Sequence, residues 1–155
     1  MNEANKAILH RFVAEVLNGK NMAVFDELVA PDVFVHNLPP GVPSNHEGWK
    51  GYINMFMNAF PDMRVVVEDT IAGEVCNPET ATNLPMNPNM DRVVLRVSMQ
   101  GTHQGELMSA GSKGIFSIAA TGKTVNVSGM TIDSISGGKI VEHWEKPDLL
   151  SIMQQ

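Results

Sequence analysis

The sequence predicts an α+β domain in which a curved antiparallel sheet wraps around helices from the first part of the chain. Apolar side chains recur at helical spacing up to Phe60, and strand-like segments dominate from Met63 onward. Because the two kinds of element are segregated along the chain, an α+β architecture is favoured over an alternating one. A sheet packed on helices along only part of its length leaves an internal apolar pocket, which is the default ligand site.

Three helices are predicted before the first long strand. The first repeats apolar residues at helical spacing, the second precedes Pro31, and the third begins after a capping residue, Ser44 or Asn45. Their predicted ranges are 3–18, 22–30 and 46–60.

Five strands are predicted at residues 32–37, 63–71, 91–104, 121–134 and 139–145. A tight Gly137-Gly138 turn joins the last two and pairs Ser136 with Lys139, which places Asp133 opposite Glu142 unless a bulge changes the register. A short C-terminal helix is predicted to begin at Pro147.

Two connections, 73–90 and 108–120, are longer than hairpin turns require. Natural lids, specificity loops, or loops diversified by engineering on a stable scaffold would all give this pattern. Successive hairpin connections leave opposite ends of the strands, so these loops are not expected to form one surface.

Composition narrows the classes of function. The 155 residues fit one domain spanning 1–155, and a formal charge of -6 without a basic run disfavours nucleic acid as a partner. The polar N-terminus and the lack of a long apolar run predict a cytoplasmic protein without a membrane partner. A single cysteine, Cys76, and the absence of metal-ligand or phosphate-loop spacing predict neither metal nor cofactor.

Several short motifs resemble one family in their order and spacing. They are Ala30-Pro-Asp32, His36-Asn37, His46-Glu-Gly-Trp-Lys-Gly51, Phe60-Pro-Asp62, Gly101-Thr-His-Gln-Gly105, Thr121-Gly-Lys123, and Gly138-Lys-Ile-Val-Glu-His-Trp144 with Pro147-Asp148. Across nearly the whole chain, they resemble the SnoaL-like polyketide cyclases, whose cone-shaped fold is shared with nuclear transport factors and ketosteroid isomerase.

The resemblance implies ring closure of a polyketide by intramolecular aldol condensation without metal or cofactor, and a homodimer formed through the sheet. The acid/base position falls at Glu145, where the cyclases carry aspartate, and their assisting histidine falls at Thr131. Threonine can only hydrogen-bond there, whereas glutamate can still act as a base. The two long connections also depart from the compact turns of the family.

The candidate catalytic residues are therefore Glu145, His143, Asp133 and Thr131. Strand alternation places His143 on the same face as Glu145 and opposite to Glu142. In a dry pocket a carboxylate is a stronger base, whereas a solvated strand end would leave it inert. The candidate ligand contacts are His36, Trp49, Tyr52, Phe56, His103, Glu142 and Trp144.

The aromatic residues of the third helix could clamp a planar polycyclic ligand, although their spacing is also that of a core stripe. Tyr52 differs because a buried hydroxyl could donate to a substrate oxygen.

The leading hypothesis is a cyclase or isomerase acting on an apolar, carbonyl-bearing small molecule. A second hypothesis is a non-catalytic domain that carries a hydrophobic ligand or binds a protein through its two long loops. A third is a water-activating, epoxide-opening hydrolase, which would need Asp133 and Arg96 together in the pocket.

Overall fold

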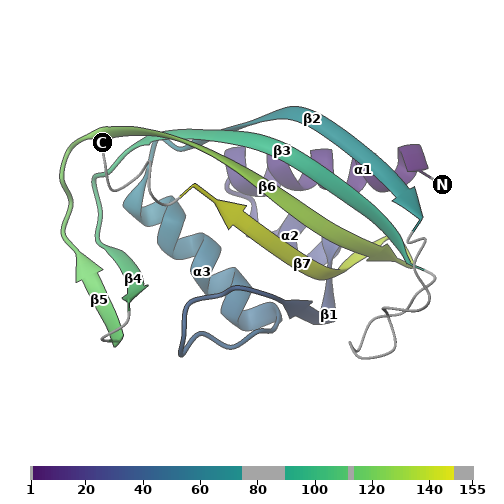
Figure 1. The fold of residues 1–155 in the computed structure, drawn as a ribbon, viewed down its shortest axis with the longest axis horizontal. Helices are drawn as coiled ribbons and strands as arrows, with labels where there is room; N and C mark the ends of the chain where they lie inside the picture. Colours follow the sequence, from purple (N-terminus) through teal and green to yellow (C-terminus); the bar gives the residue numbers. More distant parts are fainter. Residues whose placement is uncertain (1, 75–89, 112–113, 149–155) are drawn as a thin grey trace.

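The computed structural model describes residues 2–74, 90–111 and 114–148 (Figure 1). Helical segments come first and most strands last, as the sequence predicts. The helical segments are α1 (Asn2–Arg11), the π-helical turn η1 (Phe12–Asn18), α2 (Met22–Leu28) and α3 (His46–Ala59). The strands are β1 (Val29–Val35), β2 (Arg64–Glu74), β3 (Asp91–Thr102), β4 (Leu107–Gly111), β5 (Gly114–Ile118), β6 (Thr124–Ser136) and β7 (Lys139–Pro147).

The main sheet has the strand order β1-β7-β6-β3-β2 and curves over the helices (Figure 1). Neighbouring strands are antiparallel except β1 and β7, which run parallel. The sheet is therefore mixed, whereas the sequence predicted a purely antiparallel one. Parallel pairing is possible because most of the chain separates these two strands and no hairpin joins them. The curved, open sheet with helices inside it confirms the predicted α+β cone.

The ends of the second helix and of the first strand differ from those predicted. Helix α2 ends at Leu28 because Val29 is already extended, and β1 therefore begins earlier than predicted. The same strand ends at Val35, before Asn37, whose φ of 61° lies in the left-handed region. Asparagine tolerates that region better than most residues, which lets the chain turn there. The Asn45 side chain caps α3 by accepting a hydrogen bond from the Gly48 amide at 3.0 Å.

The predicted loop 108–120 is wrong in part. β4 and β5 take up most of it as an antiparallel hairpin that begins at Leu107, which pairs with Ile118. Its small and polar residues suggested a loop, but strand pairing is decided by the partner strand as well as by composition. Residues 75–89 of the other long connection, and the predicted C-terminal helix from residue 149 onward, lie outside the described residues.

The turn between β6 and β7 is the predicted two-residue one. Gly137 and Gly138 both have positive φ, and Ser136 pairs with Lys139. The pairing then shifts, because Ile135 faces Ile140 whereas Ser134 faces Glu142, leaving Val141 as an extra residue in a bulge. The predicted opposition of Asp133 and Glu142 is therefore wrong, and Asp133 faces His143 instead.

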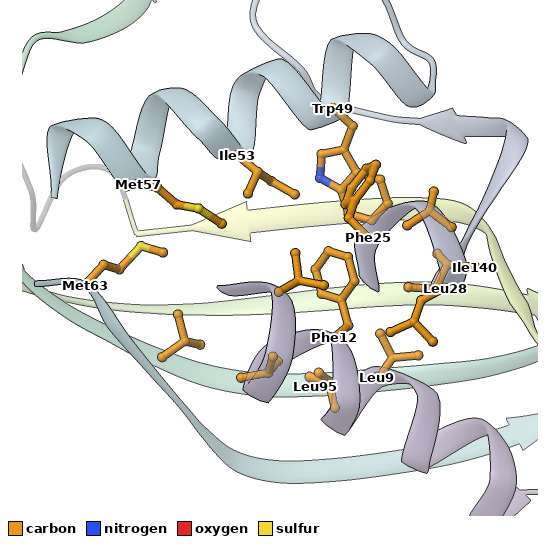
Figure 2. Close-up of a cluster of buried hydrophobic side chains, with 14 of the residues drawn as sticks. Leu9, Phe12, Phe25, Leu28, Trp49, Ile53, Met57, Met63, Leu95 and Ile140 are labelled. Atoms are coloured by element: carbon orange, nitrogen blue, oxygen red, sulfur yellow. The ribbon is translucent and has the colours of Figure 1, made fainter. Parts of the chain in front are cut away.

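The core lies between the helices and the concave face of the sheet. In Figure 2, Trp49, Ile53 and Met57 of α3 point toward Phe12 and the sheet. Phe25 is fully buried and contacts the Trp49 ring edge-on at 5.5 Å. Of the aromatic stripe, Trp49 and Phe60 at its two ends are therefore part of the core, whereas Tyr52 and Phe56 between them are only partly buried.

Candidate active site

A cavity of about 140 Å³ lies between the first helical stretch, α3 and the inner face of the sheet. Its walls are mostly apolar, and its titratable side chains come from β6, β7 and α3. The lining residues are Leu9, Phe12, Val13, Leu17, Trp49, Tyr52, Ile53, Phe56, Met63, Val65, Leu95, Val97, Met99, Val127, Ser128, Gly129, Thr131, Asp133, His143, Glu145 and Pro147.

All four candidate catalytic residues line this cavity. On β6, Thr131 and Asp133 are two residues apart and share one face, as do His143 and Glu145 on β7. The register then makes Asp133 the neighbour of His143, and Thr131 the neighbour of Glu145. The bulge at Val141 lies between this group and the turn, so it sets which side chains meet.

Asp133 and His143 form a buried pair. His143 Nδ1 donates to Asp133 Oδ1 at 2.7 Å, and the two residues are only 6% and 1% exposed, respectively. The Thr131 hydroxyl donates to the other Asp133 oxygen at 2.9 Å. Burial alone lowers the pKa of His143, but the charge and hydrogen bond of Asp133, aided by Glu145, raise it from 6.5 to about 9. The imidazole is therefore held as a cation at neutral pH.

Glu145 lies beside this pair but in a wetter environment. Its Oε2 is 3.9 Å from His143 Nε2, and its side chain is 44% exposed. Of the two environments expected for this carboxylate, a water-excluded pocket and a solvated strand end, the structure is therefore closer to the solvated one. A solvent-accessible carboxylate next to an imidazolium can exchange protons with water and with a molecule in the cavity.

Trp49 and Tyr52 of α3 border the polar group. The Trp49 ring stacks on the His143 imidazole at 4.2 Å and on Phe12 at 5.3 Å, so it fixes the imidazole plane. Burial, followed by the negative charge of Glu145, raises the pKa of the Tyr52 hydroxyl above its ordinary value. Within the described part of the chain, no hydrogen bond occupies that hydroxyl. Tyr52 is therefore a neutral donor available to a ligand.

Three predicted ligand contacts lie on the other face of the sheet. Glu142 and Trp144 alternate with His143 and Glu145, so they point away from the cavity. There, His36 Nε2 lies 2.9 Å from Glu142 Oε1, and the His36 ring stacks on Trp144 at 4.3 Å. The structure therefore does not place these three predicted ligand contacts at the cavity.

His103 does not line the cavity either. It is buried at the end of β3, where it stacks on Phe60 at 5.2 Å and its Nδ1 lies 3.2 Å from the Thr121 hydroxyl. Arg96, which the hydrolase hypothesis requires beside Asp133, is exposed and forms an ion pair with Glu68. Both features are structural contacts outside the cavity.

Sequence reasoning missed the wall that the first helical stretch contributes. Leu9, Phe12, Val13 and Leu17 line the cavity, and their helical spacing marked them only as core. The direct pairing of Asp133 with His143 was also missed, because no sequence signal indicates the extra residue Val141.

Among residues 2–74, 90–111 and 114–148, no cluster of three or more His, Cys, Asp or Glu side chains is placed to hold a metal ion. In the same ranges, no helix has the length and apolar character needed to cross a membrane.

A family model described as SnoaL-like polyketide cyclase matches residues 7–90 and 86–155. The chain belongs to this family. Among curated proteins, none matches the sequence of this SnoaL-like chain.

Solved structures share the fold over nearly the whole length of this SnoaL-like chain. TsrD from Streptomyces laurentii is 20% identical with a TM-score of 0.75, and the match covers 99% of this chain and 94% of TsrD. A protein from Acidithiobacillus ferrooxidans is 25% identical with a TM-score of 0.71, covering 98% and 93% of the two chains. IdmH from Streptomyces antibioticus is 23% identical with a TM-score of 0.70, covering 97% and 96%.

Proposed function

We propose that this SnoaL-like chain is a cofactor-independent cyclase or isomerase that moves protons beside a carbonyl group of an apolar small molecule. The observation that carries the proposal is that Glu145, His143 and Tyr52 all line one mostly apolar cavity. Carbonyl chemistry of this kind requires a base near the α-carbon and hydrogen-bond donors near the oxygen.

Glu145 is the general acid/base in this proposal. Its carboxylate takes a proton from the carbon next to the carbonyl, and the electron pair of the broken C–H bond moves to the carbonyl oxygen to form an enolate. In a cyclase, the enolate carbon attacks a second carbonyl of the same molecule, and the new alkoxide takes the proton back. In an isomerase, the proton returns to a different carbon. The side chain is 44% exposed, so it can also exchange its proton with water.

His143 and Tyr52 stabilise the enolate. With its Nδ1 donating to Asp133, the imidazolium has its Nε2–H left to donate toward the side of the cavity where Glu145 lies. Tyr52 supplies a neutral O–H donor near the same carboxylate. Asp133 and Thr131 act through His143, because they fix its ring and charge and do not themselves move the proton.

The test is deuterium exchange at the α-carbon of a panel of neutral ketones in D₂O, followed by NMR. We expect Glu145→Gln to lower the exchange rate by about 10²–10⁴-fold, which is the usual contribution of a positioned base. Glu47→Gln is the matched control, since Glu47 is exposed on α3 and does not line the cavity. Ketone binding without exchange in the wild type would instead support the non-catalytic binding domain.

The partner in this proposal is a second copy of the chain. A row of apolar side chains crosses the outer face of the sheet in register, with Ile132 opposite both Trp144 and Val94, and Val94 opposite Ile71. Ile71 is 63% exposed and Ile132 is 38% exposed. Apolar groups aligned on an exposed sheet face favour burial against another protein surface.

A further inference from the structure

The size of the cavity limits what can react in it. An apolar protein cavity of about 150 Å³ has room for one benzene molecule. The cavity beside Glu145 has a volume of about 140 Å³ and is open to solvent on one side, so the part of a ligand that lies inside it is limited to about a single six-membered ring.

The aromatic side chains of α3 do not leave a slot for a larger planar ligand. Trp49 is already stacked between His143 and Phe12. Phe56 contacts Tyr52 edge-on at 5.0 Å and lies 6.1 Å from Phe60. These rings pack against one another, so a polycyclic system would have to separate them, which costs packing energy.

The charges around the cavity select against anions. Two carboxylates, Asp133 and Glu145, and one imidazolium, His143, line it, and no lysine or arginine is among the lining residues that the structure describes. The positive charge of His143 is balanced by the negative charge of Asp133, so a carboxylate or phosphate ligand would meet the negative charge of Glu145 with no further cation among the described lining residues to offset it.

From this size and these charges, we infer that the part of the substrate that reacts is neutral and no larger than one carbonyl-bearing six-membered ring. A fused multi-ring polyketide system would not fit inside the cavity. The inference rests on the proposed function for the identity of the reacting group, whereas its size limit rests on the cavity alone. The carbonyl oxygen lies toward Tyr52 and His143, and the ring lies among the apolar walls.

The test is a size series of neutral ketones that share the same chemistry: cyclohexanone, β-tetralone with two fused rings, and a four-ring steroid ketone. Binding is measured by NMR shifts of the Ile53 and Val97 methyl groups, which line the cavity. We expect cyclohexanone to shift these signals, β-tetralone to bind at least about tenfold more weakly, and the steroid not to compete. Cyclohexanecarboxylate, which has the same ring and a negative charge, is expected not to bind.

If cavity size limits binding, a variant with a larger cavity should bind the two-ring ketone more tightly. Phe56→Ala removes a ring from the wall and is expected to raise β-tetralone affinity by about tenfold or more. Phe34→Ala is the control, since Phe34 is exposed and does not line the cavity. Phe56→Leu replaces the alanine variant if that variant does not fold, with a smaller gain in the same direction.

The outcomes separate this inference from the proposed function. Equal binding of one-ring and four-ring ketones by the wild type would overturn the size limit, even if Glu145-dependent exchange is observed. A preference for one ring that persists in Glu145→Gln supports the size limit, even if the wild type exchanges no protons and the proposed function fails.

Discussion

Replacing Asp133 with asparagine tests the negative charge that keeps His143 protonated in the cavity. Asp133 is almost fully buried, and both of its oxygens are hydrogen-bonded, one to His143 and the other to Thr131. Asparagine has nearly the same shape but no negative charge. The substitution therefore removes the main factor that raises the pKa of His143 while keeping most of the packing.

The size of the effect follows from the pKa of His143. That pKa rises from 6.5 to about 9 on folding, and each unit corresponds to about 1.4 kcal/mol. The protonated imidazole thus contributes at most about 3 kcal/mol to the free energy of unfolding. Because the pKa is raised in the folded state, this contribution is fully present below about pH 6.5 and is lost as the pH rises through about 9.

The assay is urea unfolding at a series of pH values from 6 to 10, paired with NMR titration of the His143 ring. We expect the wild type to lose about 3 kcal/mol across that interval. Asp133→Asn should start less stable and show a much flatter pH profile, with a lower His143 pKa. Asp32→Asn, at an exposed site on β1, is the control and should keep the wild-type profile. Parallel pH profiles for wild type and Asp133→Asn would refute the reasoning.

Three further predictions concern Tyr52, Thr131 and Ile132. Tyr52→Phe should lower kcat for proton transfer by about 100-fold and leave the urea midpoint unchanged, because its hydroxyl has no partner in the described chain; an unchanged kcat would remove Tyr52 from the mechanism. Thr131→Val should lower the free energy of unfolding by about 2 kcal/mol, since Asp133 loses a buried hydrogen bond; a change below about 0.5 kcal/mol in urea unfolding would contradict that contact. Ile132→Asp places a charge in the apolar row beside Trp144 and should convert the proposed homodimer to a monomer. Size-exclusion chromatography with light scattering measures this, and a monomeric wild type would rule out the proposed dimer.

Local sequence signals predicted most of the elements. The helical spacing in residues 3–18 and 46–60 matched α1 with η1 and α3, because each segment buries one face against the sheet. The Gly137-Gly138 turn was also predicted, since a two-residue hairpin loop requires positive φ at both positions. Alternation along β7 correctly placed His143 and Glu145 on one face.

Features that depend on pairing between distant segments were not predictable in the same way. The parallel pairing of β1 with β7 and the β4–β5 hairpin depend on which strands meet in the folded chain. Likewise, His36 was a candidate ligand contact from its sequence position, but the side of the sheet it occupies is decided by the pairing of β1.

The bulge at Val141 is the local feature on which the candidate site depends most. In a regular hairpin from the Gly137-Gly138 turn, Asp133 would face Glu142, and two carboxylates would meet in place of a carboxylate and an imidazole. The extra residue lets β7 advance by one position, which brings His143 opposite Asp133 and onto the cavity face.

This arrangement makes a specific prediction for deletion of Val141. Ile140 already faces Ile135, and Glu142 already faces Ser134, so removing the residue between them leaves one-to-one pairing on both sides of the bulge. We expect the variant to keep the bond between His143 and Asp133 and a His143 pKa near 9, measured by NMR titration. Its free energy of unfolding should fall, because the bulge also bends β7 where it meets β1. A His143 pKa near 6.5 in a variant that still folds would show that the extra residue is needed to hold the pair together, and not only to set the register.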